Sequence, residues 1–223
     1  MSVKDLRLCV ALFVGVLGVA RSATADPVVI YSNFGSTPGY ASAAWPGSGW
    51  LSSEENAYYM GFQLTEAARL TSVTLPTGWS GAQPVNFGAT VFSSVGGALG
   101  GVIERMVIPF PADVPSRTIT TLTLPSALQP LLSANTLYFL GALPTQVSGP
   151  GFAFSSLWPW NNAGVGGPVV VASPAGRFLT QGTLGAFQLT GDLSPTPEPS
   201  TMLLFTTGAG LILQRVRRRR MSR

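Results

Sequence analysis

Short apolar runs separated by glycine or proline fill the chain between residues 26 and 193. The runs are rich in Val, Ile, Thr and Phe, and each is shorter than ten residues. This composition and length are typical of β-strands bounded by turns. We predict strands at Val28–Ser32, Tyr58–Leu64, Leu70–Leu75, Phe87–Ser93, Val102–Ile108, Thr118–Leu124, Thr136–Leu143, Gly151–Ser155, Val169–Ala172 and Leu184–Thr190.

The spacing of apolar positions within these runs indicates how the strands pack. Residues 87–92 and 185–190 alternate with a period of two, which favours sheets with one buried face. Residues 136–140 are apolar in both phases, so we expect a central strand there. No part of residues 26–193 has a convincing helical period. The pattern predicts an all-β domain, a two-sheet antiparallel sandwich of jelly-roll-like form.

The first 25 residues have the pattern of a secretory signal peptide. Lys4 and Arg7 form a positive start, and residues 8–20 form an apolar segment too short for a lasting anchor. Ala23 and Ala25 give the small-x-small pattern that signal peptidase cleaves, which predicts a mature start at Asp26. We therefore expect an exported protein.

Residues 194–223 hold a Pro-rich linker, an apolar run and a basic end, in that order. The uncharged run 199–214 would span roughly 24 Å as a helix, about a turn short of the hydrocarbon core of a bilayer. The arginines that follow are expected to stop transfer and to stay in the cytoplasm. They are Arg215, Arg217, Arg218, Arg219, Arg220 and Arg223. We predict a single transmembrane helix with the preceding domain outside.

Pro197, Glu198 and Pro199 stand immediately before the apolar run. This order of Pro-Glu-Pro, apolar run and arginine cluster resembles the PEP-CTERM sorting signal of Gram-negative bacteria. The resemblance implies that exosortase, a membrane protease-transpeptidase, cuts near the motif. It also implies transient residence in the inner membrane, followed by the cell surface or the extracellular matrix. The alternative is an ordinary C-terminal anchor with a Pro-rich spacer, which would leave a membrane-tethered periplasmic domain.

The charge of the chain is unevenly distributed. The whole sequence has 13 Lys and Arg against 9 Asp and Glu, but residues 26–193 keep four arginines against seven acids, a net charge of 4 − 7 = −3. The basic balance therefore belongs to the targeting segments, and we expect no nucleic-acid partner.

The predicted mature domain has neither histidine nor cysteine, because the single Cys of the chain is Cys9. This absence argues against Ser-His-Asp and Cys-His nucleophiles and against metal sites built on imidazole or thiolate. No phosphate-binding glycine loop is present. We expect no cofactor, no metal and no catalysis.

Four stretches of the domain resemble the choice-of-anchor family of extracellular β domains. They are Tyr31–Phe34, Arg69–Pro76, Leu132–Phe139 and Phe187–Gly191. Domains of that family are attached through varied C-terminal signals, PEP-CTERM among them. The resemblance implies an extracellular β domain and no catalytic residue.

Two sets of acidic residues are candidates for chemistry. Glu54 and Glu55 could serve a glycan-active enzyme, but neighbours on an extended chain point to opposite sides, and a partner such as Glu66, Glu104 or Asp113 would be needed. Asp26 and Asp192 could bind a structural Ca²⁺ where the chain ends meet. The simpler interpretation of Glu54 and Glu55 is a solvated acidic loop.

The five tryptophans lie in sequence surroundings rich in Gly, Pro, Ser and Asn, which predicts that they occupy connections between strands. Trp158 and Trp160 could stack on sugar rings while Asn161 bonds hydroxyl groups. The alternative is that tryptophans close the open ends of the sandwich.

The sequence thus predicts a non-catalytic structural or glycan-associated module, with exopolysaccharide as a candidate partner. A carboxylate-dependent glycan-active enzyme is the other alternative.

Overall fold

The computed structural model describes most of the predicted domain. The described residues are 26–35, 39–50, 53–81, 83–147, 154–173 and 175–193. The predicted signal peptide, with Ala23 and Ala25, lies outside these residues. The predicted sorting signal, with Pro197, Glu198, Pro199 and the arginines after the apolar run, lies outside them as well. Both assignments stay predictions.

The described chain is all-β and contains no helix, as the periodicity predicts. Accordingly, nothing in the described part has the length and apolar character of a membrane-crossing helix. Its strands are β1 Val28–Ser32, β2 Tyr40–Trp50, β3 Ser53–Gln63, β4 Ala68–Gly81, β5 Pro84–Val95, β6 Ala98–Pro109, β7 Thr120–Pro125, β8 Leu131–Leu132, β9 Leu137–Val147, β10 Phe154–Asn161, β11 Gly166–Ser173, β12 Gly176–Thr183 and β13 Gln188–Leu193.

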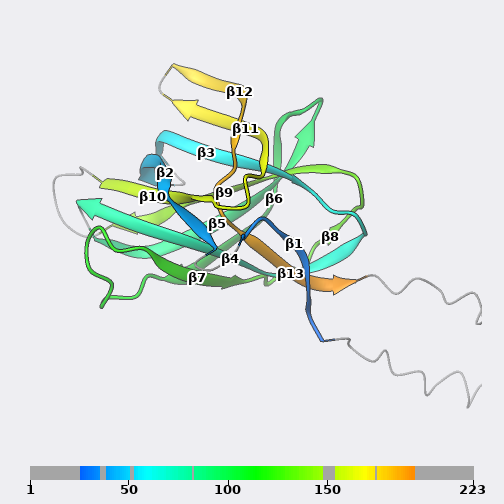
Figure 1. The fold of residues 1–223 in the computed structure, drawn as a ribbon, viewed down its shortest axis with the longest axis horizontal. Coiled ribbons are helices and arrows are strands. Elements are labelled where there is room, and N and C mark those ends of the chain that lie inside the picture. The colour runs from blue at the N-terminus through cyan, green and yellow to red at the C-terminus, as the bar shows by residue number, and fades with distance from the viewer. Residues whose placement is uncertain are drawn as a thin grey trace, which may run out of the picture.

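The strands form two antiparallel sheets that are joined along one side (Figure 1). In the first sheet β1 pairs with β13, β13 with β4, and β4 with β7 and β8. In the second sheet the order is β6, β5, β9, β3, β11 and β12. The strands β2 and β10 pair with each other and connect β4 to β3, so hydrogen bonding continues from one sheet to the other.

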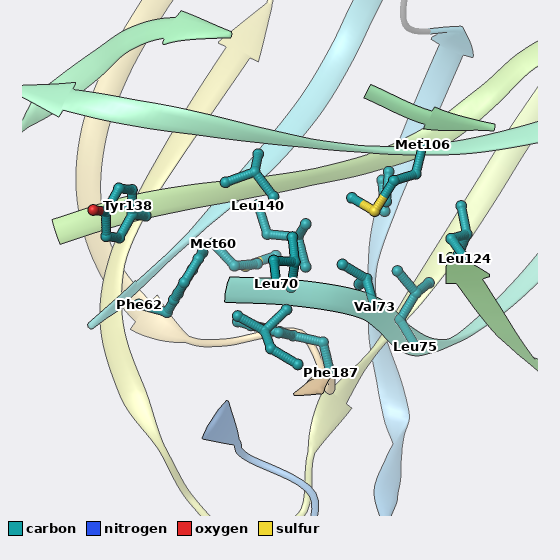
Figure 2. Close-up of a cluster of buried hydrophobic side chains, with 14 of the residues drawn as sticks. Met60, Phe62, Leu70, Val73, Leu75, Met106, Leu124, Tyr138, Leu140 and Phe187 are labelled. Atoms are coloured by element: carbon teal, nitrogen blue, oxygen red, sulfur yellow. The ribbon is translucent and has the colours of Figure 1, made fainter. Parts of the chain in front are cut away.

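The main hydrophobic core lies between the two sheets. Alternate residues of β3, β5 and β9 face inward, among them Met60, Phe62 and Leu140, and they meet Leu75 of β4 and Phe187 (Figure 2). The period of two in the sequence produces this packing, because every second side chain of a strand points to the same face. The two-sheet arrangement predicted from that period is confirmed.

A second, smaller cluster occupies the outer face of the second sheet. Tyr59, Phe92 and Phe139 are buried there with Val170, and the rings of Tyr59 and Phe92 meet edge to face at 5.2 Å. Residues 136–140 are apolar in both phases because strand β9 contributes Tyr138 and Leu140 to one cluster and Phe139 to the other. The prediction of a central strand is confirmed, since β9 pairs with β3 and β5.

Several strand predictions were incomplete. Strands β2, β8 and β12 were not predicted, because they are short or rich in small and polar residues. Strand β10 continues to Asn161, and β13 begins only at Gln188. The prediction that all five tryptophans occupy connections was wrong, because all of them lie in strands. Trp45 and Trp50 belong to β2, Trp79 to β4, and Trp158 and Trp160 to β10.

Candidate functional site

The residues predicted to contact glycan lie where β10 meets the segment that leads into the last strand. This segment, residues 184–187, connects β12 to β13 and is buried along its whole length. It makes only an isolated bridge between Gly185 and Trp160 and otherwise lies outside the regular ladders. A buried backbone without ladder partners must find its hydrogen bonds elsewhere.

Every backbone N–H and C=O of residues 184–187 has a hydrogen-bond partner. Four of the bonds are ordinary backbone contacts, to Val165, Asn161, Pro159 and Asn33. The Gly185 amide donates to the Met60 sulfur at 3.4 Å. The remaining groups bond to residues of β10 and of the segment after β1, chiefly through the side chains of Asn33, Trp158 and Asn161. We call residues 184–187 with these three side chains the clamp.

Trp158 is only 5% exposed, and its indole nitrogen donates to the Ala186 carbonyl at 2.9 Å. Its ring lies so close to Gly185 that a β-carbon there would come within 2.7 Å of the indole. The ring also packs against Phe187, with 6.0 Å between ring centroids. Trp158 therefore has no free face for a sugar ring, which corresponds to the alternative interpretation of a tryptophan that closes the end of the sandwich.

Asn161 is 3% exposed, and its side-chain amide forms hydrogen bonds with residue 184 of the clamp and with the adjoining turn. Its side-chain nitrogen donates to the carbonyls of Val165 and Leu184, both at 2.8 Å. Its side-chain oxygen accepts from the Val165 amide at 2.7 Å. These bonds close the turn between β10 and β11, so this side chain has a structural position and does not present itself to a ligand.

Asn33, a residue that sequence reasoning missed, is the third clamp residue and is 1% exposed. Its side-chain nitrogen donates to the Gly185 carbonyl at 2.8 Å, and its oxygen accepts from the Phe187 amide at 2.7 Å. Its own amide donates to the Phe187 carbonyl at 3.2 Å. A lone asparagine after a strand gives no signal of such a role, because its partners are 152 and 154 positions away.

Trp160 differs from its neighbours because it is half-buried. It bridges to Gly185 through the backbone and lies two residues beyond the enclosed Trp158. Of the three residues predicted to contact glycan, Trp160 is therefore the one whose side chain is partly open to solvent. The glycan contact stays a prediction, and it now depends on this tryptophan.

Glu104 is the one buried acid among the described side chains, and its carboxylate is engaged in hydrogen bonds. Glu104 is 2% exposed and accepts hydrogen bonds from the Ser126 hydroxyl at 2.5 Å and from the amides of Ala127 and Leu128 at 2.8 and 2.9 Å. Both of its carboxylate oxygens are thus occupied in holding the loop after β7. Such a carboxylate is a structural anchor for backbone amides.

The other candidate acids do not share the buried position of Glu104 where their side chains are described. Glu66 and Asp113 are exposed, and the side chains of Glu54 and Glu55 lie outside the described part. Asp26 and Asp192 lie near the same end of the β1–β13 pair, because Val28 pairs with Gly191. Within the described ranges no three Asp, Glu, His or Cys residues gather as a potential metal site.

Comparison with known proteins adds no relative: no protein-family model matches the sequence, and no match was found among curated proteins.

Proposed function

We propose that this is an exported, non-catalytic β domain that a C-terminal PEP-CTERM signal delivers to the cell surface or extracellular matrix of a Gram-negative bacterium. The observation that carries the proposal is the sequence order of Pro197-Glu198-Pro199, an uncharged run and an arginine cluster. Exosortase and signal peptidase would be its processing partners. The finer form of the fold, a jelly-roll-like sandwich, belongs to the same proposal.

The arrangement of the domain ends supports this proposal. Strands β1 and β13 lie side by side and antiparallel, so the chain enters and leaves the domain at the same end of this strand pair (Figure 1). A signal segment before β1 and a membrane helix after β13 would then both attach at that end. The domain would then be attached to the membrane at one end, and the Pro-rich linker would remain accessible to a membrane protease.

The non-catalytic part of the proposal draws on the chemistry available. Because residues 26–193 contain neither His nor Cys, acid–base work at neutral pH would fall to carboxylates, and both oxygens of the buried Glu104 carboxylate already accept hydrogen bonds. We therefore place a structural role, with any exopolysaccharide contact at Trp160, ahead of a glycan-active enzyme.

Replacing Glu198 tests the sorting signal. In native cells, Glu198→Ala should leave most of the protein uncut in the inner membrane, because the residue between the two prolines is the part of the motif that a protease would recognise by charge. Cell fractionation and mass spectrometry of the C-terminus measure the cut fraction. The control is Glu66→Ala, which removes an exposed acid within the domain. Equal release of both variants and the wild type would reject the sorting signal in favour of a plain anchor.

A further inference from the structure

Sheet edges are places where backbone hydrogen-bonding groups lack partners, and proteins usually protect them. Among the described strands, β1 has five residues and an irregular register, and β7 has six residues and ends at Pro125. Strand β6 carries the exposed Arg105, and its pairing with β5 is interrupted by two irregularities. Each of these edges has a feature that discourages another strand from pairing with it.

Strand β12 is an edge without such protection. It has eight residues, contains no proline and pairs only with β11 among the described strands. The β11–β12 register is regular over all eight residue pairs, from Gly166–Thr183 to Ser173–Gly176. Its one charged residue is Arg177, next to its start. A long, regular and nearly uncharged edge is the kind that accepts a further strand.

The hairpin of β11 and β12 forms one end of the second sheet, where β11 pairs with β3 (Figure 1). At its middle both faces of β12 are open, because Phe178 is 55% exposed and Leu179, on the opposite face, is 51% exposed. Leu179 pairs across the hairpin with Val170, which is buried in the outer cluster around Tyr59. The apolar surface of Leu179 is thus continuous with a buried cluster and ends abruptly at the open edge.

The sequence of β12 is self-complementary in an antiparallel pair. Two antiparallel strands related by a two-fold axis have the same face of the sheet on the same side. Odd-numbered residues of one copy therefore lie opposite odd-numbered residues of the other, and even-numbered residues lie opposite even-numbered ones. In one such register Leu179 faces Leu179, Phe178 faces Thr180 and Arg177 faces Gln181 of the other copy. The two Arg177 positions are then about 13 Å apart along the strands, beyond the screening length of about 8 Å at physiological salt.

We propose that β12 pairs with β12 of a second copy in this register, so that the second sheet runs continuously through both molecules. A second copy is favoured over a charged peptide because the edge offers a single charge for recognising such a partner. The same register covers Leu179 with Leu179, an apolar cross-strand contact of the kind that stabilises sheets. The dimer goes beyond the proposed sorting function and does not depend on it.

Cysteine cross-linking tests both the dimer and its register, because Cys9 is the single cysteine of the chain. The full-length protein, solubilised in mild detergent, would carry Cys9→Ser together with Leu179→Cys and be oxidised by air with a copper catalyst. We expect a disulfide-linked dimer on a non-reducing gel. Phe178→Cys in the same background should give none, because the two copies of residue 178 would be about 8 Å apart, too far for a disulfide.

A second pair of variants measures association without cross-linking. Leu179→Lys should shift the protein from dimer to monomer in sedimentation experiments, because it places two like charges opposite each other. Val107→Lys, at a half-exposed position on the β6 edge, should leave the dimer unchanged. A monomeric wild type would overturn the proposal. Equal cross-linking at 178 and 179, or a cross-link from the Leu179→Cys variant to a different protein, would overturn it as well.

Discussion

At the scale of single residues, Tyr31 makes the stability of this fold depend on pH. Its ring packs between Phe187, at 5.0 Å, and Phe62, at 5.6 Å, and burial raises the pKa of the Tyr31 hydroxyl from 10.0 to about 12. The folded protein therefore keeps this proton at a pH where the unfolded chain has lost it. The stability that this group contributes is complete below pH 10.0 and declines as the pH rises toward 12, because ionisation then favours the unfolded state.

Tyr31→Phe should remove that alkaline loss of stability. We expect the wild type to lose roughly 1–2 kcal/mol of unfolding free energy across this range in excess of the variant, after allowance for the partial exposure of the ring. Urea denaturation at a series of pH values measures the difference. Residues 26–193 contain no lysine, so lysine titration does not obscure the effect. Parallel pH profiles for the two proteins would contradict this assignment.

At the scale of the strand, a glycine in β9 allows close packing of the cluster on the outer face of the second sheet. Gly141 of β9 lies under the Tyr59 ring, and a β-carbon at Gly141 would come within 2.7 Å of that ring. Tyr59 is fully buried and holds Phe92 in edge-to-face contact, so it has little room to move away. The glycine is therefore required by the neighbouring strand and not by its own backbone conformation.

Gly141→Ala should destabilise the protein by about 1–3 kcal/mol, the usual cost of overpacking a core. Urea denaturation followed by tryptophan fluorescence provides the measurement. Gly101→Ala, in strand β6, is the matched control, because its nearest contact would be the Ser93 hydroxyl at 4.0 Å. A destabilisation of the same size in both variants would point to backbone effects and contradict the packing explanation.

At the scale of the whole molecule, the clamp ties the beginning of the domain to its end. Asn33 follows the first strand, and its side chain bonds Gly185 and Phe187 just before the last strand. Strands β1 and β13 then pair directly. The domain can complete its fold only after residues 185–193 are available, so an exported chain would finish folding when nearly all of it has crossed the membrane.

Asn33→Ala should destabilise the domain by about 2–5 kcal/mol, because it leaves the Phe187 amide and the Gly185 carbonyl buried without partners. Equilibrium urea unfolding measures the loss. Gln63→Ala, which removes an exposed amide from β3, should change stability by less than about 0.5 kcal/mol. A small effect of Asn33→Ala would mean that water replaces the side chain, and the clamp would then not be a principal tie.

The sequence by itself determined the class of the fold and the location of the core. Period-two alternation in residues 87–92 and the doubly apolar segment 136–140 indicated strands, and strand geometry leaves little freedom in which face such residues occupy. The alternation could not reveal β12 or β2, because exposed and small residues carry no burial signal. It also placed the tryptophans of β10 in connections, since Pro159 and the following asparagines have the composition of a loop.

Only the tertiary structure decided the roles of the predicted site residues. Trp158 and Asn161 are chemically suited both to binding a sugar and to satisfying a buried backbone, and the sequence cannot distinguish these roles. The deciding fact is that residues 184–187 are buried outside the regular ladders and require hydrogen-bond partners, which Asn33, Trp158 and Asn161 provide. These contacts join residues that are 23 to 154 positions apart, a proximity that local sequence patterns do not encode.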